Sequence, residues 1–439
     1  NDSKIVKNLS PISSYQCTYK FAENNTIKSD LKLNSSATKV NIKFPISSSD
    51  SEGWLDWFQI TSWKNLIWNG VPMYVLNPEA SSFQTTAYTI NNANTTLTTW
   101  DVTQPLNISS VKNNTINNTL TFVDESFQKN NQYVVFNAAT ANAQPDFNGT
   151  VENQNLHMLD NLDFAIIYHA SLKDEALRLL KHRQQFSSLV GVAVDIDQIY
   201  NEFSSGTKDP TSVRDFARML YSRNTRFKYL TLFGSASYDY RYLNTKNKDL
   251  NLVPTYETPE SLDPIYGFPS DDYFGLLDNG EGENLNGKLD IAVGRIISRT
   301  IDEARIMVDK IIRYDTDPLT LGDWRLNNLF TADDEDGNTH FYDMDRIAIF
   351  NQEKNKNINQ QKVYLDAYEQ VSTPGGERYP EVTKAINDAI FQGNFVYAYM
   401  GHGGPTGLAQ ERVLQEPDIK VWDNIYKMPL MITATCTFT

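Results

Sequence analysis

The chain has 439 residues, too many for one ordinary core, so we predict two or three domains. Its formal net charge of −15 argues against a broad nucleic-acid-binding surface, because a phosphate backbone requires a positive footprint. The only two cysteines, Cys17 and Cys436, exclude a disulfide framework but leave one bridge open, and no apolar run is long enough to predict a membrane-spanning helix.

Residues 1–155 predict a β-rich N-terminal region. Short stretches at residues 31–44 and 132–138 alternate polar and apolar side chains, as half-exposed strands do. Pairs of Asn and Ser punctuate them as turns. We therefore expect one or two modules of the β-sandwich or jelly-roll type. We expect the tryptophans of this region to pack in its core rather than bind glycan: Trp54, Trp57, Trp63, Trp68 and Trp100.

Residues 156–318 alternate between buried strands and amphipathic helices. Continuous apolar runs predict strands at residues 162–169, 189–196, 227–234 and 289–296. Apolar residues at helical spacing predict helices at residues 173–186, 209–221 and 300–315. Asp209 and Pro210 begin the second helix, and Thr300 with Glu303 forms a capping box for the third. We predict an α/β subdomain over this range.

Residues 319–439 repeat the alternation after a break at residues 315–324 and predict a second α/β subdomain. Strands are expected at residues 327–336, 361–368, 394–401 and 428–436, and helices at residues 340–350 and 380–391. Such alternation predicts open, mostly parallel sheets that are covered on both faces. The last strand is apolar on both faces, so we expect it to lie inside its sheet and the protein to continue past Thr439.

Three predicted strand ends in residues 319–439 carry reactive side chains. They are the acidic run Asp333–Asp336, then His402 between glycines, then Cys436. Histidine and cysteine lie 436 − 402 = 34 residues apart, enough for one crossover between neighbouring strands. An imidazole favours the thiolate and can protonate a leaving amine, and a carboxylate can orient that imidazole. The N–H groups of Gly403 and Cys436 are candidates for an oxyanion hole.

Each of these features has a simpler interpretation when it is taken alone. A single cysteine that ends an apolar strand is usually a small buried side chain. A histidine between glycines can belong to a turn, and an acidic run is usually a solvated loop. Their order along one sheet favours cysteine-nucleophile chemistry.

Several segments resemble the gingipain-type cysteine peptidases, which belong to a caspase-like clan. The motifs YMGHGG and TATC carry the resemblance, and FGSASYDYR, SDDYFGLLD, ADDEDGNTH and GHGGPTGLAQERVL narrow it to the sortases of the bacterial type IX secretion system. The resemblance covers the chain from about Asn155 to its end. The chain departs from the family where Thr, Phe and Thr follow Cys436, since gingipains commonly have Asn-Gly there.

The resemblance implies a caspase-like α/β catalytic unit of two subdomains and a set of site residues. Cys436 corresponds to the nucleophile and His402 to the general base and acid. The third member is Asp333, Asp334 or Glu335, of which we favour Asp334. No cofactor is expected for catalysis.

The resemblance also implies a biological role. The enzyme is expected to cleave a C-terminal β-sandwich signal from secreted cargo and pass the acyl group to surface lipopolysaccharide or water. Its expected partner is an outer-membrane β-barrel of the PorV type, at the surface of a Bacteroidetes cell. Two alternatives stay open: a secreted gingipain-like endopeptidase, and an inactive surface binding protein.

A second acidic segment is a weaker candidate for a metal site. Gingipains carry calcium, which prefers oxygen clusters, and Asp271, Asp272, Asp278 and Glu281 offer one. A polar hairpin with Asn279-Gly280 as its turn is the simpler interpretation. His340 can pair with the acidic run or begin the following helix.

Overall fold

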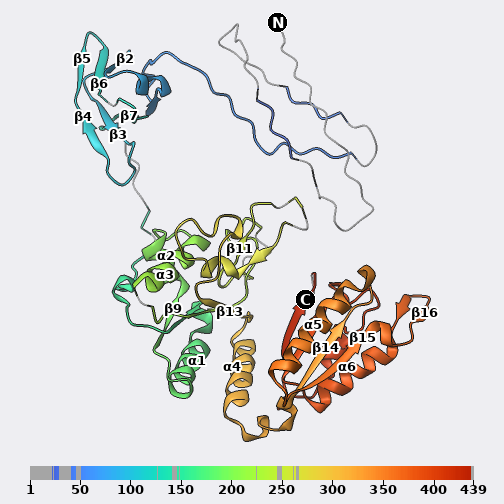
Figure 1. Cartoon of the computed structure of the whole chain (residues 1–439). Helices are drawn as coiled ribbons and strands as arrows, with labels where there is room; N and C mark the ends of the chain where they lie inside the picture. Colours follow the sequence, from blue (N-terminus) through green and yellow to red (C-terminus); the bar gives the residue numbers. More distant parts are fainter. Residues whose placement is uncertain are drawn as a thin grey trace. The chain divides into compact units, whose positions relative to one another are not determined.

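The computed structural model describes residues 22, 24–28, 41–45, 51–125, 127–140, 146–147, 149–223, 225–244, 250–260, 262–263 and 266–436. The chain divides into two compact units, Asp30–Glu152 and one that contains Asn153–Thr439 (Figure 1). Cys17 and residues 31–40 of the strand segment expected over 31–44 lie outside the described residues. Residues 41–44 are described and form no strand, so that part of the prediction is wrong. Cys436 is a free cysteine.

The first unit is a small antiparallel sandwich. One sheet has the order β1-β7-β3-β4 and the other the order β2-β6-β5. The strands are β1 (Met73–Leu76), β2 (Thr86–Asn91), β3 (Leu97–Asp101), β4 (Ser109–Val111), β5 (Asn113–Ile116), β6 (Thr119–Asp124) and β7 (Gln132–Asn137). Ile90, Phe122 and Val135 come from both sheets and share one core, so the expected β-rich region is confirmed.

The tryptophans of this unit do not all pack in its core. Trp68 is buried, but Trp54, Trp57 and Trp63 are 86%, 60% and 70% exposed. The core prediction is therefore wrong for these three, because residues 51–66 are described but form no strand, and nothing turns alternate side chains toward a core. It is also wrong for Trp100, which is 40% exposed because β3 turns Leu97 and Thr99 to the core instead.

The second unit contains two parallel sheets, and the first has the order β13-β10-β8-β9. Its strands are β8 (Phe164–Tyr168), β9 (Gly191–Asp195), β10 (Tyr229–Phe233) and β13 (Ala292–Ile296). Helices α2 (Ile196–Phe203) and α3 (Pro210–Arg223) cover one face with Ile199 and Phe216. Helices α1 (Lys173–Phe186) and α4 (Ile301–Thr316) cover the other with Leu179 and Val308. The predicted strands and helices are confirmed.

The expected helix caps are present in this sheet's connections. Asp209 accepts a hydrogen bond from the N–H of Thr211 at 2.8 Å, at the start of α3. Thr300 accepts from the N–H of Glu303 at 3.2 Å, at the start of α4. The carboxylate of Glu303 accepts from the N–H of Arg299 at 2.7 Å, one residue before the N-cap, so the N-cap half of the predicted box is present but its return bond goes to Arg299 rather than to Thr300.

The second sheet has the order β15-β14-β18-β21 and is also parallel throughout. Its strands are β14 (Asn327–Ala332), β15 (Asn359–Tyr364), β18 (Val396–Met400) and β21 (Leu430–Ala434). Helix α6 (Pro380–Gln392) packs on one face, helix α5 (Thr339–Lys354) on the other (Figure 1, orange). Leu329 and Phe330, neighbours in β14, point to opposite faces. The sheet is therefore buried on both sides near its middle.

The last strand differs from its prediction. β21 lies at the edge of this sheet in the part of the chain that the structure describes, not in its interior. Leu430 and Ile432 are 60% and 52% exposed, so its apolar character does not report burial here.

Short two-residue and three-residue pairs complete the fold. They are β11 (Tyr256–Glu257) with β12 (Pro269–Ser270), β16 (Val371–Thr373) with β17 (Gly376–Arg378), and β19 (Gly403–Gly404) with β20 (Gly407–Leu408). A further short helix, α7 (Glu416–Lys420), precedes β21. Among the described helices, none combines the length and apolar character needed to cross a membrane.

Candidate active site

The ends of β14, β18 and β21 lie side by side. The register pairs Ala332 with Met400 and Met400 with Ala434. His402 lies two residues after Met400, and Cys436 lies two residues after its partner Ala434. The two side chains therefore follow corresponding positions of neighbouring strands, which lie about 4.8 Å apart. Cys436 is exposed, so the simpler interpretation of a buried core cysteine is wrong.

Two glycines allow the end of β18 to pass between its neighbours. Gly401 has φ of +155°, and a Cβ there would lie 2.3 Å from Cβ of Asp333. A Cβ on Gly403 would lie 2.4 Å from Oγ1 of Thr435. Real Cβ atoms do not approach other atoms so closely. The glycines around His402 are thus required by packing against both neighbouring strands.

The main chain of His402 is held on both sides. Its N–H donates to Oδ2 of Asp333 at 2.8 Å. Its carbonyl accepts from the hydroxyl of Tyr399 at 2.6 Å and from the N–H of Ala409 at 2.8 Å. Asp333 is 1% exposed, and burial raises the pKa of its carboxyl, although the N–H of His402 opposes that shift. Asp333 therefore fixes the backbone of His402.

The carboxylate beside the imidazole is Asp336. Its Oδ2 lies 2.9 Å from Nε2 of His402, and both side chains are about half exposed. Asp334, which the sequence favoured, instead accepts from the hydroxyl of Tyr379 at 2.7 Å. The physical reason is a tight reversal, because Asp336, Gly337 and Asn338 all have φ near +60° and turn the chain back over the end of β18.

The sequence contained a signal for that reversal. Asp, Gly and Asn are the residues that adopt left-handed backbone conformations most readily. The acidic run Asp333–Asp336 ends directly in Gly337-Asn338, which marks the turn and its fourth acidic residue.

Glu411 is a buried acidic residue that the sequence analysis missed. It is 2% exposed, and its Oε1 accepts from Nε2 of Gln370 at 3.1 Å. Burial and the nearby carboxylates of Asp334 and Asp333 raise the pKa of its carboxyl. One oxygen of each of the three carboxyls lies within 4.8 Å of the others. No sequence signal marks Glu411, since an acidic residue in a loop is normally exposed.

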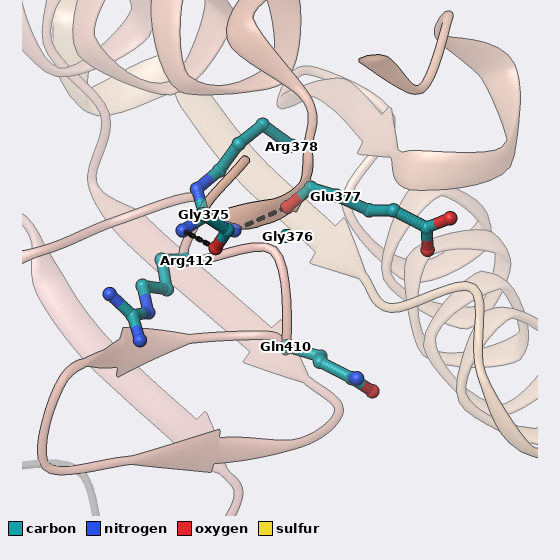
Figure 2. A pocket seen from close by; sticks show the side chains of 6 residues that line it. All are labelled: Gly375, Gly376, Glu377, Arg378, Gln410 and Arg412. Carbon is teal, nitrogen blue, oxygen red and sulfur yellow. Dashed lines mark hydrogen bonds between the residues drawn. The ribbon is translucent and has the colours of Figure 1, made fainter. Parts of the chain in front are cut away.

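A pocket of about 410 Å³ lies beside the same loop (Figure 2). Its lining residues are Gly375, Gly376, Glu377, Arg378, Gln410 and Arg412. The guanidinium of Arg378 donates to the carbonyl of Gly375 at 2.7 Å and so ties the β16–β17 hairpin. Two arginine side chains against one glutamate, Glu377, give the lining a net positive charge, which suits an anionic group.

The candidate calcium residues do not all come together. Oδ2 of Asp271 lies 2.7 Å from Nε of Arg295, and its Oδ1 accepts from Thr255. Asp278 and Glu281 lie instead with Asp290, and their carboxylate oxygens fall within 4.8 Å of one another. Asp271 is thus committed to an arginine. Calcium binding, Asp272 included, stays a prediction, as does the oxyanion role of Gly403.

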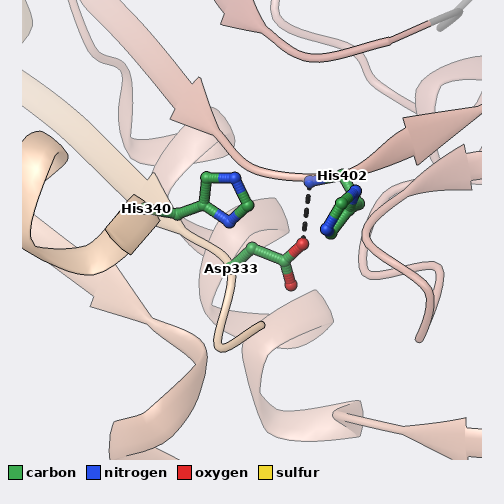
Figure 3. Close-up of side chains that lie close together, drawn as sticks. All are labelled: Asp333, His340 and His402. Carbon is green, nitrogen blue, oxygen red and sulfur yellow. Dashed lines mark hydrogen bonds between the residues drawn. The ribbon is translucent and has the colours of Figure 1, made fainter. Parts of the chain in front are cut away.

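The remaining histidine of the acidic segment fits both of its interpretations. His340 is the second residue of α5, and its Nε2 lies 3.8 Å from Oδ2 of Asp336. Asp333, His340 and His402 each offer a ligand atom within 4.8 Å of the others (Figure 3).

Comparison with known proteins decides the family. The model of peptidase family C25 matches residues 157–439. The chain belongs to peptidase family C25. By family it is a cysteine peptidase, and the predicted gingipain-type α/β fold after a β-rich region is confirmed.

The C25 chain is similar to several solved structures. It shares 29% identity with dimeric latent PorU from Porphyromonas gingivalis, with a TM-score of 0.51, over 57% of this chain and 25% of that one. The complex of RgpB pro- and mature domains from the same organism is 18% identical, with a TM-score of 0.46, over 62% and 55% of the two chains. The Arg-specific proteinase gingipain R is 16% identical, with a TM-score of 0.46, over 65% and 56%.

The match to PorU confirms the predicted resemblance to a PorU or gingipain-type protein. The C25 chain spans about a quarter of the length of that PorU chain. No curated protein matches it significantly.

Proposed function

We propose that this C25 chain is the catalytic part of a type IX secretion sortase. The observation that carries the proposal is the placement of His402 and exposed Cys436 two residues past one registered pair of parallel strands. The 29% identity to PorU and the motifs shared with type IX sortases support this branch of the family. The substrate is the C-terminal β-sandwich signal domain of secreted cargo.

The proposed chemistry proceeds through a thioester. The thiol of Cys436 gives its proton to His402, and the thiolate attacks the carbonyl that precedes the signal domain. His402 then protonates the departing amine, which leaves with the signal domain. An amine of surface lipopolysaccharide, or water, then attacks the thioester carbonyl and loses a proton to His402. The bond between carbon and sulfur breaks, the acyl group leaves on the amine or water, and His402 returns the proton to the thiolate of Cys436. Since Asp336 contacts Nε2 of His402, Nδ1 is the ring nitrogen assigned to these proton transfers.

The same proposal places the protein at the cell surface, peripheral to the outer membrane of a Bacteroidetes bacterium. A PorV-type outer-membrane β-barrel is the proposed partner that holds it there. Both assignments rest on the resemblance to type IX sortases.

The Arg-lined pocket disfavours one alternative. An endopeptidase that cleaves after basic residues needs an acidic pocket, but Arg378 and Arg412 line the pocket beside the His402 loop. Gln410 of that pocket directly follows Ala409, which donates to the carbonyl of His402. A basic substrate side chain would meet a net positive lining there, since the two arginines outnumber Glu377.

The test is a cleavage assay with the full-length protein. Wild type and Cys436→Ala are incubated with a cargo protein that carries its C-terminal signal domain, with and without lipopolysaccharide. Mass spectrometry of the new C-terminus reports hydrolysis or acyl transfer. We expect wild type alone to release the signal domain. Cleavage of unstructured peptides without release of that domain would instead indicate the endopeptidase.

The third alternative, an inactive binding protein, needs a separate measurement. An electrophilic peptide probe is applied to wild type and His402→Ala, and labelling of Cys436 is mapped by mass spectrometry. Slow labelling that is equal in both proteins would indicate a thiol without an activating base.

A further inference from the structure

His340 is a second histidine in the active site, and the proposed reaction leaves it without a role. Its ring lies against that of His402, with centroids 5.2 Å apart and planes at 90°. Its Nδ1 is buried and has no hydrogen-bond partner among the described residues. A buried ring nitrogen without a partner is costly, so its persistence requires an explanation.

The residues around His340 form a donor set for a metal ion. Figure 3 shows the rings of His340 and His402 facing the carboxylate of Asp333 from two sides. One ligand atom from each lies within 4.8 Å of the others. Two imidazoles and one carboxylate are ligands that Zn²⁺ and similar transition-metal ions prefer, whereas Ca²⁺ prefers oxygen alone.

The distances are compatible with a tetrahedral ion after small side-chain rotations. Ligand atoms on tetrahedral Zn²⁺ lie about 3.3 Å apart, given bonds of about 2.0–2.1 Å. The ring of His402 is about half exposed and therefore has room to rotate.

Asp336 supplies a further feature of metal sites. Its Oδ2 lies 2.9 Å from Nε2 of His402 and 3.8 Å from Nε2 of His340. Ligating histidines usually hold a carboxylate on the ring nitrogen that does not face the metal. Asp336 can therefore orient the ring of His402 through a hydrogen bond and leave its Nδ1 for the ion, whereas it lies beyond hydrogen-bond distance of His340. Nδ1 of His340, which has no partner among the described residues, is also left for the ion.

We propose that Asp333, His340 and His402 bind a divalent transition-metal ion of the Zn²⁺ type, which switches the peptidase off. The inhibitory part rests on the proposed function, because bound metal takes the lone pair that His402 uses as a base. Three protein ligands leave a fourth position open beside the end of β21, where a thiolate of Cys436 is a suitable ligand. Removal of the ion restores the imidazole, so the inhibition is reversible.

The sequence did not suggest this site. The three ligands lie at positions 333, 340 and 402, with no short metal-binding motif. Only the parallel register of β14 with β18 and the helix that follows β14 bring them together.

The first experiment measures metal binding without any need for activity. Full-length Cys436→Ala, which cannot react and lacks the thiol, is titrated with Zn²⁺ by calorimetry. The same titration is made with His340→Phe and, as a matched control, His182→Phe in that background. His182 also lies near a carboxylate, with Nε2 2.7 Å from Asp315, but no second histidine joins it in the described groups.

We expect one Zn²⁺ per chain in Cys436→Ala and in the His182 control. His340→Phe is expected to weaken this binding by about 10–100-fold or more. Absence of stoichiometric binding, or equal binding by the His340 variant, would overturn the site whatever the protein's activity.

The second experiment tests inhibition at the intact thiol. The rate of Cys436 labelling is followed during Zn²⁺ titration of wild type and His340→Phe, each relative to its own metal-free rate. We expect Zn²⁺ to slow wild type, a chelator to reverse this, and the same concentration of Ca²⁺ to have no effect. His340→Phe is expected to need at least about 10-fold more Zn²⁺.

The two experiments separate failure of the site from failure of the function. Equal inhibition of both proteins would mean that His402 and Cys436 hold the ion alone, which overturns the role of His340. Binding in the first experiment with unreactive Cys436 in the second would retain the site but refute both the inhibition and the proposed catalysis.

Discussion

The two parallel sheets of the α/β unit have the same strand order but different chemistry. Numbered by their own sequence, the strands of each follow the order 2-1-3-4, as β9-β8-β10-β13 in one sheet and β15-β14-β18-β21 in the other. In both, a glycine of positive φ follows the third strand directly, Gly234 at +146° and Gly401 at +155°. Both glycines donate to the last residue of the fourth strand, at 2.9 Å and 3.1 Å.

The corresponding positions differ in their side chains and in one main-chain bond, since the N–H of Ser235 donates to the carbonyl of Ser298 and that of His402 to Asp333. Register places Phe233 with Ile296 in one sheet and Met400 with Ala434 in the other. Two residues further on, the first sheet has Ser235 and Ser298 where the second has His402 and Cys436. The same scaffold therefore presents two hydroxyls at one sheet and a base with a thiol at the other. The backbone thus places two residues side by side at the end of each sheet, and their side chains decide whether chemistry can occur there.

The largest expected difference concerns the fourth strand. Cys436→Ala should abolish cargo cleavage, by about 10⁴-fold or more, because it removes the thiol that forms the thioester. Ser298→Ala, at the corresponding position, should leave cleavage unchanged, since Ser298 is buried and follows a strand of the other sheet. The check is the cleavage assay, with circular dichroism to confirm folding. Residual turnover by Cys436→Ala would remove the nucleophile from the proposal.

The third strand should show the next largest difference. His402→Ala is expected to slow labelling of Cys436 by about 10²–10⁴-fold, because the thiol loses its base. Ser235→Ala, the corresponding change, removes a hydrogen bond to the carbonyl of Leu250 and should lower stability without slowing labelling. The rates come from mass-mapped labelling, and thermal unfolding reports stability. If both variants were labelled more slowly, the labelling rate would depend on the integrity of the fold and not on the base His402.

Periodicity and capping predicted most of this scaffold. Continuous apolar runs gave β8, β10, β14 and β18, since a strand buried on both faces needs apolar residues throughout. Helix α2 was missed because Ile196 follows the last residue of β9 with no polar linker between them. Edge strand β21 was misplaced because its apolar sequence is the same as that of a central strand.

The site was predictable only where it follows strand ends. His402 and Cys436 follow strands directly, so their register could be foreseen. Asp336 depends on three consecutive left-handed residues, and His340 and Glu411 depend on a helix and a loop packed against β18. Tertiary packing fixed those positions, and single-sequence patterns do not report it.

The paired glycines provide a test of the scaffold itself. A Cβ at Gly234 would lie 3.1 Å from Cβ of Leu252, whereas one at Gly401 would lie 2.3 Å from Cβ of Asp333. Both alanine variants should lose stability from backbone strain, but Gly401→Ala should lose about 1–3 kcal/mol more from overpacking. Urea unfolding measures both. Equal losses would mean that the end of β18 adjusts as freely as that of β10.

Asp336→Asn should have a smaller effect than loss of His402. Its contact with Nε2 is about half exposed, so it is expected to contribute about 1 kcal/mol, or roughly 5–10-fold in the labelling rate. Asp334→Asn is the matched control, because Asp334 contacts Tyr379 rather than the imidazole. The rates of both variants are measured between pH 6 and pH 8. A larger loss of labelling rate in Asp334→Asn than in Asp336→Asn would indicate that Asp334, as the sequence predicted, is the carboxylate that supports His402.

Buried carboxyls give the smallest expected effect and contrast the two sheets through pH. Asp163, at the start of the first sheet, accepts from the N–H of Val190 and from Arg226, which lower the pKa of its carboxyl. Glu411, beside the second sheet, has its pKa raised, mainly by burial and then by Asp334 and Asp333. The folded state is therefore stabilised by the ionised form of Asp163 and by the protonated form of Glu411.

The signs of the two pH dependences are therefore opposite. The contribution of Asp163 is present above its unfolded pKa of about 3.9 and is lost as pH falls through the lower folded value. That of Glu411 is fully present below its unfolded pKa of about 4.3 and is lost as pH rises through the higher folded value.

Asp163→Asn should lower Tm at pH 7 and lose this effect toward pH 3. Glu411→Gln should raise Tm by about 2–4 °C at pH 7 and by less at pH 4, because it keeps an acceptor for Gln370 but cannot ionise. Calorimetry at the two pH values measures each shift. If Glu411→Gln raised Tm equally at pH 4 and pH 7, ionisation of Glu411 would not destabilise the folded protein. The second sheet would then tolerate a buried carboxylate as well as the first, where Arg226 compensates the charge of Asp163.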